Sequence, residues 1–232
     1  MKTIIVIPAY NEAGSISGVV SSIKESGCNV DIVVINDGSS DNTACEARQE
    51  GVAVVSLPVN LGIGGAVQTG YIYALRHGYD CAVQIDGDGQ HNPVDLPKLL
   101  SLVENGQADM AIGSRFVQET DYKPPFFRHV GIKYFSNLVK LLTGQAVFDT
   151  TSGYRAVNKK VIELFAKYYP SDYPEVETVA YAAKNNMKIK EVSVDMLYRE
   201  QGKSSITPLK SIYYAIKVTF SLLFFKKRGG YS

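Results

Sequence analysis

Two aspartates separated by one glycine, Asp86 and Asp88, are the residues of this sequence whose types and spacing point most directly to chemistry. They follow an apolar run that ends at Ile85, and side chains at positions i and i+2 of an extended chain point to the same side. Two such carboxylates can hold one hard cation, Mg²⁺ or Mn²⁺, and the adjacent glycines let the backbone turn closely around it. A polar Gly-Asp turn is the alternative. An EF-hand is excluded, because the twelfth loop position is Pro97 where a glutamate is required.

Two further polar segments follow apolar runs nearer the N-terminus. Residues 8–12 (PAYNE) come after the run 3–7, and residues 36–41 (NDGSSD) come after the run 31–35. Open α/β sheets bind ligands at the carboxyl ends of their parallel strands, so both segments are candidates for a nucleotide site. An acidic residue there can accept a hydrogen bond from a base or a ribose, and Tyr10 can flank a base. A loop that leads into a helix N-cap is the common alternative for the second segment.

The elements that must position these loops alternate between short β-branched runs and helical patterns, which predicts βα units on a largely parallel sheet flanked by helices. The expected strands cover residues 3–7, 31–35, 52–56, 82–85, 110–112 and 189–197. The expected helices cover residues 14–26, 64–76, 126–142, 158–168, 176–185 and 208–225, with two more that open at 40–42 and at 92–93. Asn92 followed by Pro93 is typical of an N-cap and the first helical position.

Composition excludes several classes of protein. The chain has 232 residues, a formal net charge of +1 and 45% hydrophobic residues, as expected of a folded domain with no overall attraction to nucleic acid. Its three cysteines form no CxxC pair, so we expect neither a disulfide framework nor a zinc knuckle. We expect the protein to be located in a reducing cytosol. The sequence contains no run of about 18 uninterrupted apolar residues, so it does not predict a membrane-spanning helix.

The C-terminal segment differs from the rest of the chain. The last 32 residues contain six basic residues and no acidic one. Apolar residues recur at helical spacing through this segment: Leu209, Ile212, Tyr213, Ile216, Phe220, Leu223 and Phe224. Such an amphipathic, basic helix can lie at an anionic membrane surface; packing on the body or on a second copy of the chain is the alternative. We therefore divide the chain into an α/β domain, residues 1–205, and a C-terminal helix and tail, residues 206–232.

The motifs, taken in order, resemble those of the family-2 glycosyltransferases of GT-A fold. The matching segments are residues 7–12 (IPAYNE), 34–39 (VINDGS), 60–62 (NLG), the pair Asp86 and Asp88, and 113–115 (GSR). Within that family the chain is most similar to the polyprenyl-phosphate glycosyltransferases. That similarity rests on residues 86–91 (DGDGQH), 113–116 (GSRF), 149–155 (DTTSGYR) and 199–204 (REQGKS). The resemblance implies the GT-A fold of nucleotide-diphospho-sugar transferases.

The resemblance also implies roles for individual residues. The donor nucleotide would be bound by Pro8, Tyr10, Glu12 and Asp37, together with the Asp86 and Asp88 carboxylates. Asp86, Asp88 and Gln90 would hold Mg²⁺ or Mn²⁺. Asp88 and Arg115 would act in catalysis, Arg115 by neutralising the departing diphosphate. Asp149 occupies the place where relatives with hydroxyl acceptors carry a general base, and we keep it as an orienting residue. Apart from the resemblance, we interpret His91 as a residue that supports the metal ligands or the structure, and not as a metal ligand itself.

An acceptor phosphate would need cations of its own. The candidates are Arg128, Arg199 and Lys203 with Ser204, because guanidinium groups match phosphate geometry. Ser136 and Asn137 could bond the same group. A phosphate ester is already anionic at neutral pH, so it needs no strong general base. Solvated surface charge is the alternative for these cations.

The leading hypothesis is therefore an inverting, metal-dependent enzyme that moves a sugar from a nucleotide donor to polyprenyl phosphate. UDP-glucose or UDP-N-acetylglucosamine is favoured over GDP-mannose, and undecaprenyl over dolichyl phosphate. The alternatives are a family-2 transferase acting on a glycan hydroxyl, with Asp149 as its base, and a catalytically silent nucleotide-sugar binder that recruits a membrane partner. We expect a peripheral location on the cytoplasmic face of the membrane. A small integral membrane protein or a second copy of the chain is a candidate partner.

Overall fold

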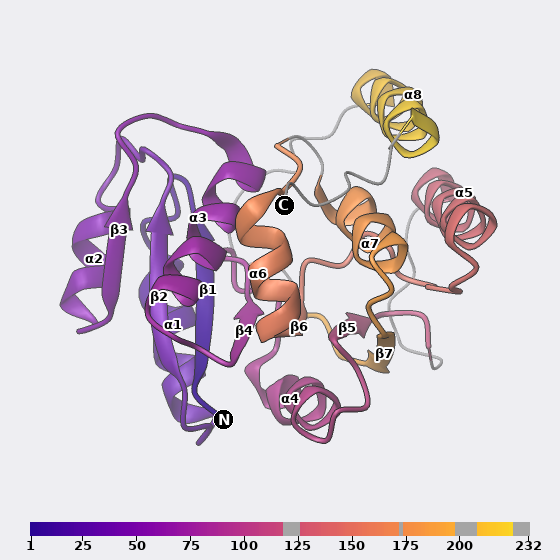
Figure 1. The fold of residues 1–232 in the computed structure, drawn as a ribbon. Helices are drawn as coiled ribbons and strands as arrows, with labels where there is room; N and C mark the ends of the chain where they lie inside the picture. Colours follow the sequence, from indigo (N-terminus) through magenta and orange to yellow (C-terminus); the bar gives the residue numbers. More distant parts are fainter. Residues whose placement is uncertain (118–125, 172–173, 198–207, 225–232) are drawn as a thin grey trace.

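The computed structural model describes residues 1–117, 126–171, 174–197 and 208–224 (Figure 1). Within these ranges one sheet has the strand order β3-β2-β1-β4-β6-β5-β7. Its strands are β1 (Thr3–Ala9), β2 (Asp31–Asn36), β3 (Ala53–Ser56), β4 (Cys81–Gln84), β5 (Met110–Ser114), β6 (Arg155–Asn158) and β7 (Ile189–Ser193). The helices are α1 (Ile16–Glu25), α2 (Thr43–Gln49), α3 (Gly62–Arg76), α4 (Leu96–Glu104), α5 (Phe126–Thr143), α6 (Lys159–Lys167), α7 (Pro174–Lys184) and α8 (Pro208–Phe224), with a 3₁₀ turn at Pro93–Asp95.

The predicted α/β architecture is confirmed, with one strand that the sequence pattern did not indicate. β1, β2, β3 and β4 pair in parallel, as do β5 and β7, whereas β6 runs antiparallel between β4 and β5. Because β6 is only four residues long and begins with an arginine, it lacks the apolar run that identifies a buried strand. The last strand is shorter than expected and ends at Ser193, beyond which Met196 forms an isolated bridge to His91.

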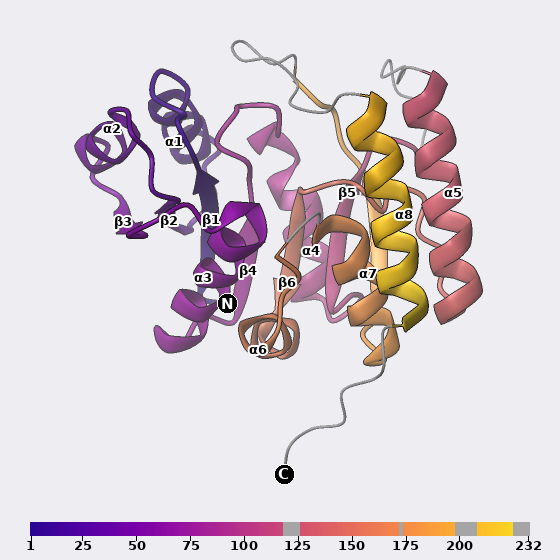
Figure 2. The ribbon, with the colours of Figure 1, turned by 90° about the horizontal axis from the view of Figure 1, so that it is seen from above.

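The sheet separates two hydrophobic cores, and alternation along β1 shows how. Ile4 and Val6 face the core formed with α3, α5, α6, α7 and α8, whereas Ile5 and Ile7 face the core formed with α1, α2 and α4. Successive residues of a strand point to opposite faces, so a strand that is covered on both faces is apolar throughout. Figure 2 shows the helices on either side of the sheet.

Helix α8 packs on the body of the protein, beside α5 and α7 (Figures 1 and 2). Val218 and Leu222 are buried in the core, and the hydroxyl oxygens of Tyr134 on α5 and Thr219 on α8 lie 3.0 Å apart. Among the α8 side chains that the structure describes, from Tyr214 to Leu223, three large apolar ones are exposed: Ile216, Phe220 and Leu223. The helix therefore has one packed apolar face and one exposed apolar face. No helix in the described ranges is both long enough and apolar enough to cross a bilayer.

Candidate functional site

The polar segments predicted to form the site do meet at the carboxyl edge of the sheet. β1 lies between β2 and β4, so the residues after all three strands emerge together. A Cβ built on Gly87 would lie 3.2 Å from the Pro8 carbonyl oxygen and 3.5 Å from Glu12 Cγ. The Ser15 hydroxyl lies 2.8 Å from the Gly87 carbonyl oxygen and 3.0 Å from Glu12 Oε2, and can donate to either. The loop with Asp86 and Asp88 thus packs directly on the first loop.

The first and second loops are joined by side chains of the second that accept backbone N–H groups of the first. Asn11 donates to Ser39 Oγ at 3.0 Å, Glu12 N donates to Thr43 Oγ1 at 2.9 Å, and Ala13 N donates to Asp41 Oδ2 at 3.1 Å. These bonds satisfy backbone groups that no secondary structure satisfies. The Tyr10 side chain, in the first of these loops, is half exposed, so its ring is accessible to a ligand.

Asp37 is almost completely buried, which the sequence did not indicate. Its Oδ1 accepts a 2.7 Å hydrogen bond from the backbone N–H of Leu61, and its own N–H donates to the Ala9 carbonyl. The carboxylate therefore fixes the start of α3 beside the second loop. Gly38 makes this approach feasible: its φ is +68°, and a Cβ there would lie 2.8 Å from the Asn60 nitrogen.

The glycine-rich start of α3 allows close packing against another segment of the chain. A Cβ on Gly64 would lie 2.1 Å from the Pro170 carbonyl oxygen, too close for any side chain. This glycine therefore lets α3 approach the segment between α6 and α7. The contact joins segments about a hundred residues apart in the sequence, so no local pattern could indicate it.

The carboxylates of Asp86 and Asp88 suit a hard divalent cation. Asp86 Oδ1 accepts from Gln84 Nε2 at 3.1 Å, its side chain is 37% exposed, and Asp88 Oδ1 accepts from the backbone N–H of Gln90 at 3.1 Å. In the described ranges no third His, Cys, Asp or Glu completes a ligand group with them. Mg²⁺ is commonly held by one or two carboxylates, with substrate phosphates and water supplying the remaining oxygens, so this donor set fits.

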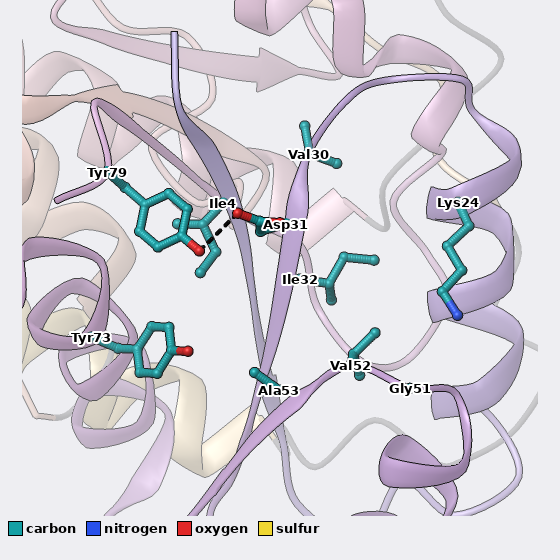
Figure 3. Close-up of a pocket in the computed structure, with 10 residues that line it drawn as sticks. All are labelled: Ile4, Lys24, Val30, Asp31, Ile32, Gly51, Val52, Ala53, Tyr73 and Tyr79. Carbon is teal, nitrogen blue, oxygen red and sulfur yellow. Dashed lines mark hydrogen bonds between the residues drawn. The ribbon is translucent and has the colours of Figure 1, made fainter. Parts of the chain in front are cut away.

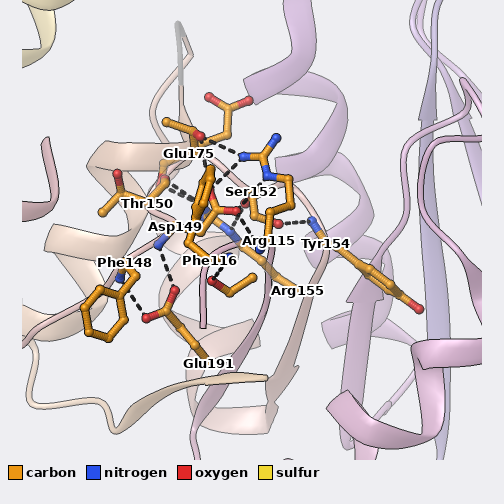
Figure 4. Close-up of polar contacts among 12 residues, drawn as sticks. Arg115, Phe116, Phe148, Asp149, Thr150, Ser152, Tyr154, Arg155, Glu175 and Glu191 are labelled. Atoms are coloured by element: carbon orange, nitrogen blue, oxygen red, sulfur yellow. Dashed lines mark hydrogen bonds and ion pairs between the residues drawn. The ribbon is translucent and has the colours of Figure 1, made fainter. Parts of the chain in front are cut away.

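Arg115 and Asp149 form a buried ion pair (Figure 4). The guanidinium donates from Nε to Oδ2 and from Nη2 to Oδ1, each at 2.7 Å, and the Arg115 backbone N–H adds a third bond to Oδ2 at 3.1 Å. Asp149 has no exposed surface and Arg115 is 5% exposed. Bidentate geometry is what allows both charges to be buried. Both Asp149 oxygens are thus engaged, which agrees with an orienting role.

Glu191 on β7 holds the chain on the other side of this pair. Its two carboxylate oxygens accept from the backbone N–H groups of Phe148 and Asp149, at 2.7 and 2.8 Å. Burial raises the pKa of Glu191, and the nearby Asp149 charge acts in the same direction, whereas the two backbone donors lower it. The sequence gave no indication of this contact, because Glu191 follows Lys190 in a short strand and no local pattern marks its partners.

Arg155 is a second buried arginine, and it ties the Asp149 loop to helix α7. Its guanidinium donates to the carbonyl oxygens of Ser152 (2.7 Å), Thr150 (3.2 Å) and Glu175 (2.7 Å), and to Thr178 Oγ1 (2.6 Å). Three carbonyls from two backbone segments converge on one guanidinium, so the cation holds the loop and the first turn of α7 together. The motif 149–155 identified the residue but not this role.

Glu175, in the first turn of α7, is an acidic residue near the candidate site that the sequence did not single out. Burial raises the pKa of its carboxyl, and the charges of Asp86 and Glu177 act in the same direction, whereas Arg155 lowers it. An acidic residue in the first turn of a helix is usual, because it complements the helix dipole, and so it drew no attention. The fold instead places this carboxyl within electrostatic reach of Asp86.

The predicted acceptor residues are placed only in part. Arg128 belongs to the first turn of α5, but its side chain lies outside the described residues, as do Arg199, Lys203 and Ser204. The Ser136 hydroxyl donates to the Val147 carbonyl and so contributes to holding the α5–β6 connection. His91 lies as expected, supporting the Asp86 loop: its Nδ1 accepts from the Asp86 backbone N–H at 3.1 Å.

A separate cavity of about 370 Å³ lies at the opposite edge of the sheet (Figure 3). Asp31 and Ala53, at the amino ends of β2 and β3, contribute to its lining. The Tyr79 hydroxyl donates to Asp31 Oδ2 at 2.9 Å, and burial together with this bond raises the pKa of Tyr79 to about 12. Its position excludes it from the site formed by the strands' carboxyl ends.

Comparison of the fold and of the sequence identifies the protein class. Glucosyl-3-phosphoglycerate synthase from Mycobacterium tuberculosis, solved with Mn²⁺, UDP and glucosyl-3-phosphoglycerate, superposes with a TM-score of 0.71 at 21% identity, over 100% of this chain and 81% of that one. The fold is thus the GT-A glycosyltransferase fold, as predicted. The chain belongs to glycosyl transferase family 2, whose family model matches residues 4–165.

Curated relatives support the narrower resemblance. The polyprenol monophosphomannose synthase of Mycolicibacterium smegmatis is 32% identical over 222 residues, which cover 89% of this chain and 81% of that one. The UDP-N-acetylglucosamine–dolichyl-phosphate N-acetylglucosaminyltransferase of Methanococcus voltae is 30% identical, over 96% of this chain and 95% of that one. The similarity to polyprenyl-phosphate glycosyltransferases, inferred from the motifs, is confirmed.

Proposed function

We propose that this protein transfers a sugar, with inversion, from a nucleoside diphosphate donor to a polyprenyl phosphate. The observation that carries the proposal is the state of Asp149. This carboxylate occupies the place of the general base in hydroxyl-accepting relatives, yet both of its oxygens accept from Arg115. A phosphate acceptor is already ionised and needs no such base, whereas a sugar hydroxyl does. An anionic acceptor therefore suits this site better.

The donor would bind across the three loops at the carboxyl edge. Tyr10 offers an exposed ring for the base. Pro8 and Glu12 in the first loop and Asp37 in the second would form the rest of the nucleotide site. Asp86, Asp88 and Gln90 would hold Mg²⁺ or Mn²⁺ beside the diphosphate. When bound, the cation supplies positive charge where negative charge develops on the departing nucleoside diphosphate. Arg115 would contribute N–H donors to the same charge, while Asp149 holds its guanidinium in place.

The names of the relatives and of the superposed structure suggest the candidate donor sugars. One relative is named for mannose and another for UDP-N-acetylglucosamine, and the superposed structure contains UDP. We favour UDP-glucose or UDP-N-acetylglucosamine, with GDP-mannose as the third candidate. The acceptor phosphate would meet Arg128, Arg199, Lys203 and Ser204, with Ser136 and Asn137 nearby along α5.

The exposed face of α8 supports a peripheral position on a membrane that contains the lipid acceptor. Ile216 and Leu223 are each 54% exposed, although Val218 and Leu222 between them are buried. Leu141 and Val130 on the neighbouring helix α5 are exposed as well, and lysines on both helices can reach lipid headgroups. Basic residues near an anionic surface contribute about 1 kcal/mol each, so binding should weaken as salt rises.

The deciding experiment is mass spectrometry of the product after incubation with a donor panel, Mn²⁺, and either a short-chain polyprenyl phosphate or a glycan acceptor. We expect a polyprenyl phosphosugar, formed only with the lipid. Arg199→Ala should raise the apparent KM for lipid phosphate or lower kcat while leaving nucleotide affinity near wild type. Arg76→Ala, in the last turn of α3 and remote from the site, is the matched control. A product formed only with the glycan, or no turnover at all, would overturn the proposal.

Membrane binding is tested separately by vesicle sedimentation. The double variant Ile216→Ser, Leu223→Ser should fold normally and lose binding to phosphatidylglycerol vesicles. Val94→Ser changes a 74% exposed apolar residue elsewhere and should bind like wild type. Equal binding by all three proteins would show that the exposed face of α8 does not contact lipid.

A further inference from the structure

The strand that leads into the loop with Asp86 and Asp88, β4, contains one amide side chain in an otherwise apolar stretch. β4 is buried at every position, and its last residue, Gln84, is 5% exposed. Burying an amide without a hydrogen bond costs free energy, so a buried glutamine requires a partner. That partner is Asp86 Oδ1, 3.1 Å from Gln84 Nε2. Gln84 and Asp86 are two residues apart in an extended chain, and their side chains therefore point to the same side.

His91 holds the same aspartate from the opposite direction. Its Nδ1 accepts from the Asp86 backbone N–H at 3.1 Å, and its Nε2 lies 3.7 Å from Asp86 Oδ2. Because Nδ1 is an acceptor, the neutral ring carries its proton on Nε2, the nitrogen nearer the carboxylate. The ring is 5% exposed and stacks on Tyr154, with centroids 4.9 Å apart and planes at 13°. Neither ring can rotate freely in this packing.

Gly153 is the third residue that lies against the Asp86 side chain. A Cβ on this residue would lie 3.0 Å from Asp86 Oδ2 and 3.2 Å from Gln84 Nε2. Those distances are shorter than most real Cβ contacts, so an alanine would displace the carboxylate or the amide. β6 brings Gly153 there, because its first residue, Arg155, lies opposite Gln84 in the antiparallel pair.

From these contacts we infer that Gln84 and His91 are positioning residues that hold the Asp86 carboxylate in its metal-binding orientation, with Gly153 leaving the space it needs. The inference rests on the proposed role of Asp86 in holding a divalent cation. Ligating carboxylates are usually fixed by hydrogen bonds from neighbouring side chains, and losing such a neighbour typically lowers metal affinity about 10–100-fold. Gln84 thus acts on the cation only through Asp86.

The test is Mn²⁺ binding in the presence of UDP, measured by electron paramagnetic resonance without any acceptor. Gln84→Met removes the amide at nearly constant volume, and we expect about tenfold weaker Mn²⁺ binding or more. Gln145→Met is the matched control, since the Gln145 amide bonds the Met187 carbonyl outside the site. Gly153→Ala should also weaken binding, although it removes no donor. His91→Asn, which keeps an acceptor for the Asp86 N–H, should retain more affinity than His91→Phe.

A double-mutant cycle separates positioning from a general effect on the fold. In an Asp86→Asn background, Gln84→Met should cause no further loss of Mn²⁺ affinity, because the carboxylate it positions is gone. The inference is overturned if Gln84→Met binds Mn²⁺ within twofold of wild type, if the loss persists in the Asp86→Asn background, or if the wild type binds no Mn²⁺. The lipid acceptor takes no part in this experiment, so failure of the proposed transfer reaction would leave its outcome unchanged. Should Gln84→Met not fold, Gly153→Ala carries the same comparison.

Discussion

Removing the Asp149 carboxylate should cost about 3–5 kcal/mol of unfolding free energy, the usual range for breaking a buried ion pair. Asp149 has no exposed surface and accepts three bonds from Arg115, two of them at 2.7 Å. In Asp149→Ala the Arg115 guanidinium would remain buried and would lose both of its 2.7 Å bonds to the carboxylate, while its bond to the Thr151 hydroxyl, 2.9 Å away, would remain. A buried cation that loses its counterion accounts for most of the expected loss.

Urea unfolding followed by circular dichroism gives the free-energy change from the midpoint and the slope. The informative comparison is the double variant Arg115→Met, Asp149→Leu. It removes both charges and fills the space with apolar side chains, so it should recover much of the stability that Asp149→Ala loses. Its sugar transfer should stay low, because the N–H donors of Arg115 are absent.

Two outcomes would refute this reasoning. If Asp149→Ala loses less than about 1 kcal/mol, the pair behaves like an exposed one and is not the buried contact described. If the double variant is no more stable than Asp149→Ala, the loss comes from packing and not from an uncompensated charge.

Three further outcomes are expected. Asp88→Asn should keep the wild-type melting temperature but lower the transfer rate about a hundredfold or more; undiminished activity of this variant in EDTA would contradict a metal role for Asp88. Because the folded-state pKa of Glu191 is raised, its contribution to stability is present below its ordinary pKa and is lost as pH rises through the folded value. The stability of wild type relative to Glu191→Gln, from urea midpoints, should therefore fall as pH rises over that range, and a rising difference would reverse the sign. Gly64→Ala should lower the melting temperature, because a Cβ would lie 2.1 Å from the Pro170 carbonyl oxygen, whereas Gly18→Ala, with open space around its Cβ, should not.

The local sequence pattern was sufficient to predict most of the helices and strands and the residues that meet at the carboxyl edge of the sheet. Alternating apolar runs and helical segments predicted β1 to β5 and the helices between them, because each pattern reports the burial of its own residues. The loop after each parallel strand must emerge at the carboxyl edge, so the sequence alone predicts that Tyr10, Asp37 and Asp86 lie close together. Asn92 likewise predicted a helix start, and its side chain accepts from Val94 N.

What the sequence by itself determined is the set of residues that the parallel strands deliver to one edge, together with the family to which their motifs belong. The tertiary structure alone decided which of them are engaged: Arg115 with Asp149, Asp37 with Leu61, and Gln84 with Asp86. It also inserted β6 between β4 and β5, which brings Gly153 and Tyr154 against the loop that contains Asp86 and His91. Local periodicity reports whether a residue is buried, but the partner of a buried charge or amide can be a hundred residues away. Only the folded chain specifies that partner, because the cost of burying a polar group is offset by a contact that no local pattern encodes.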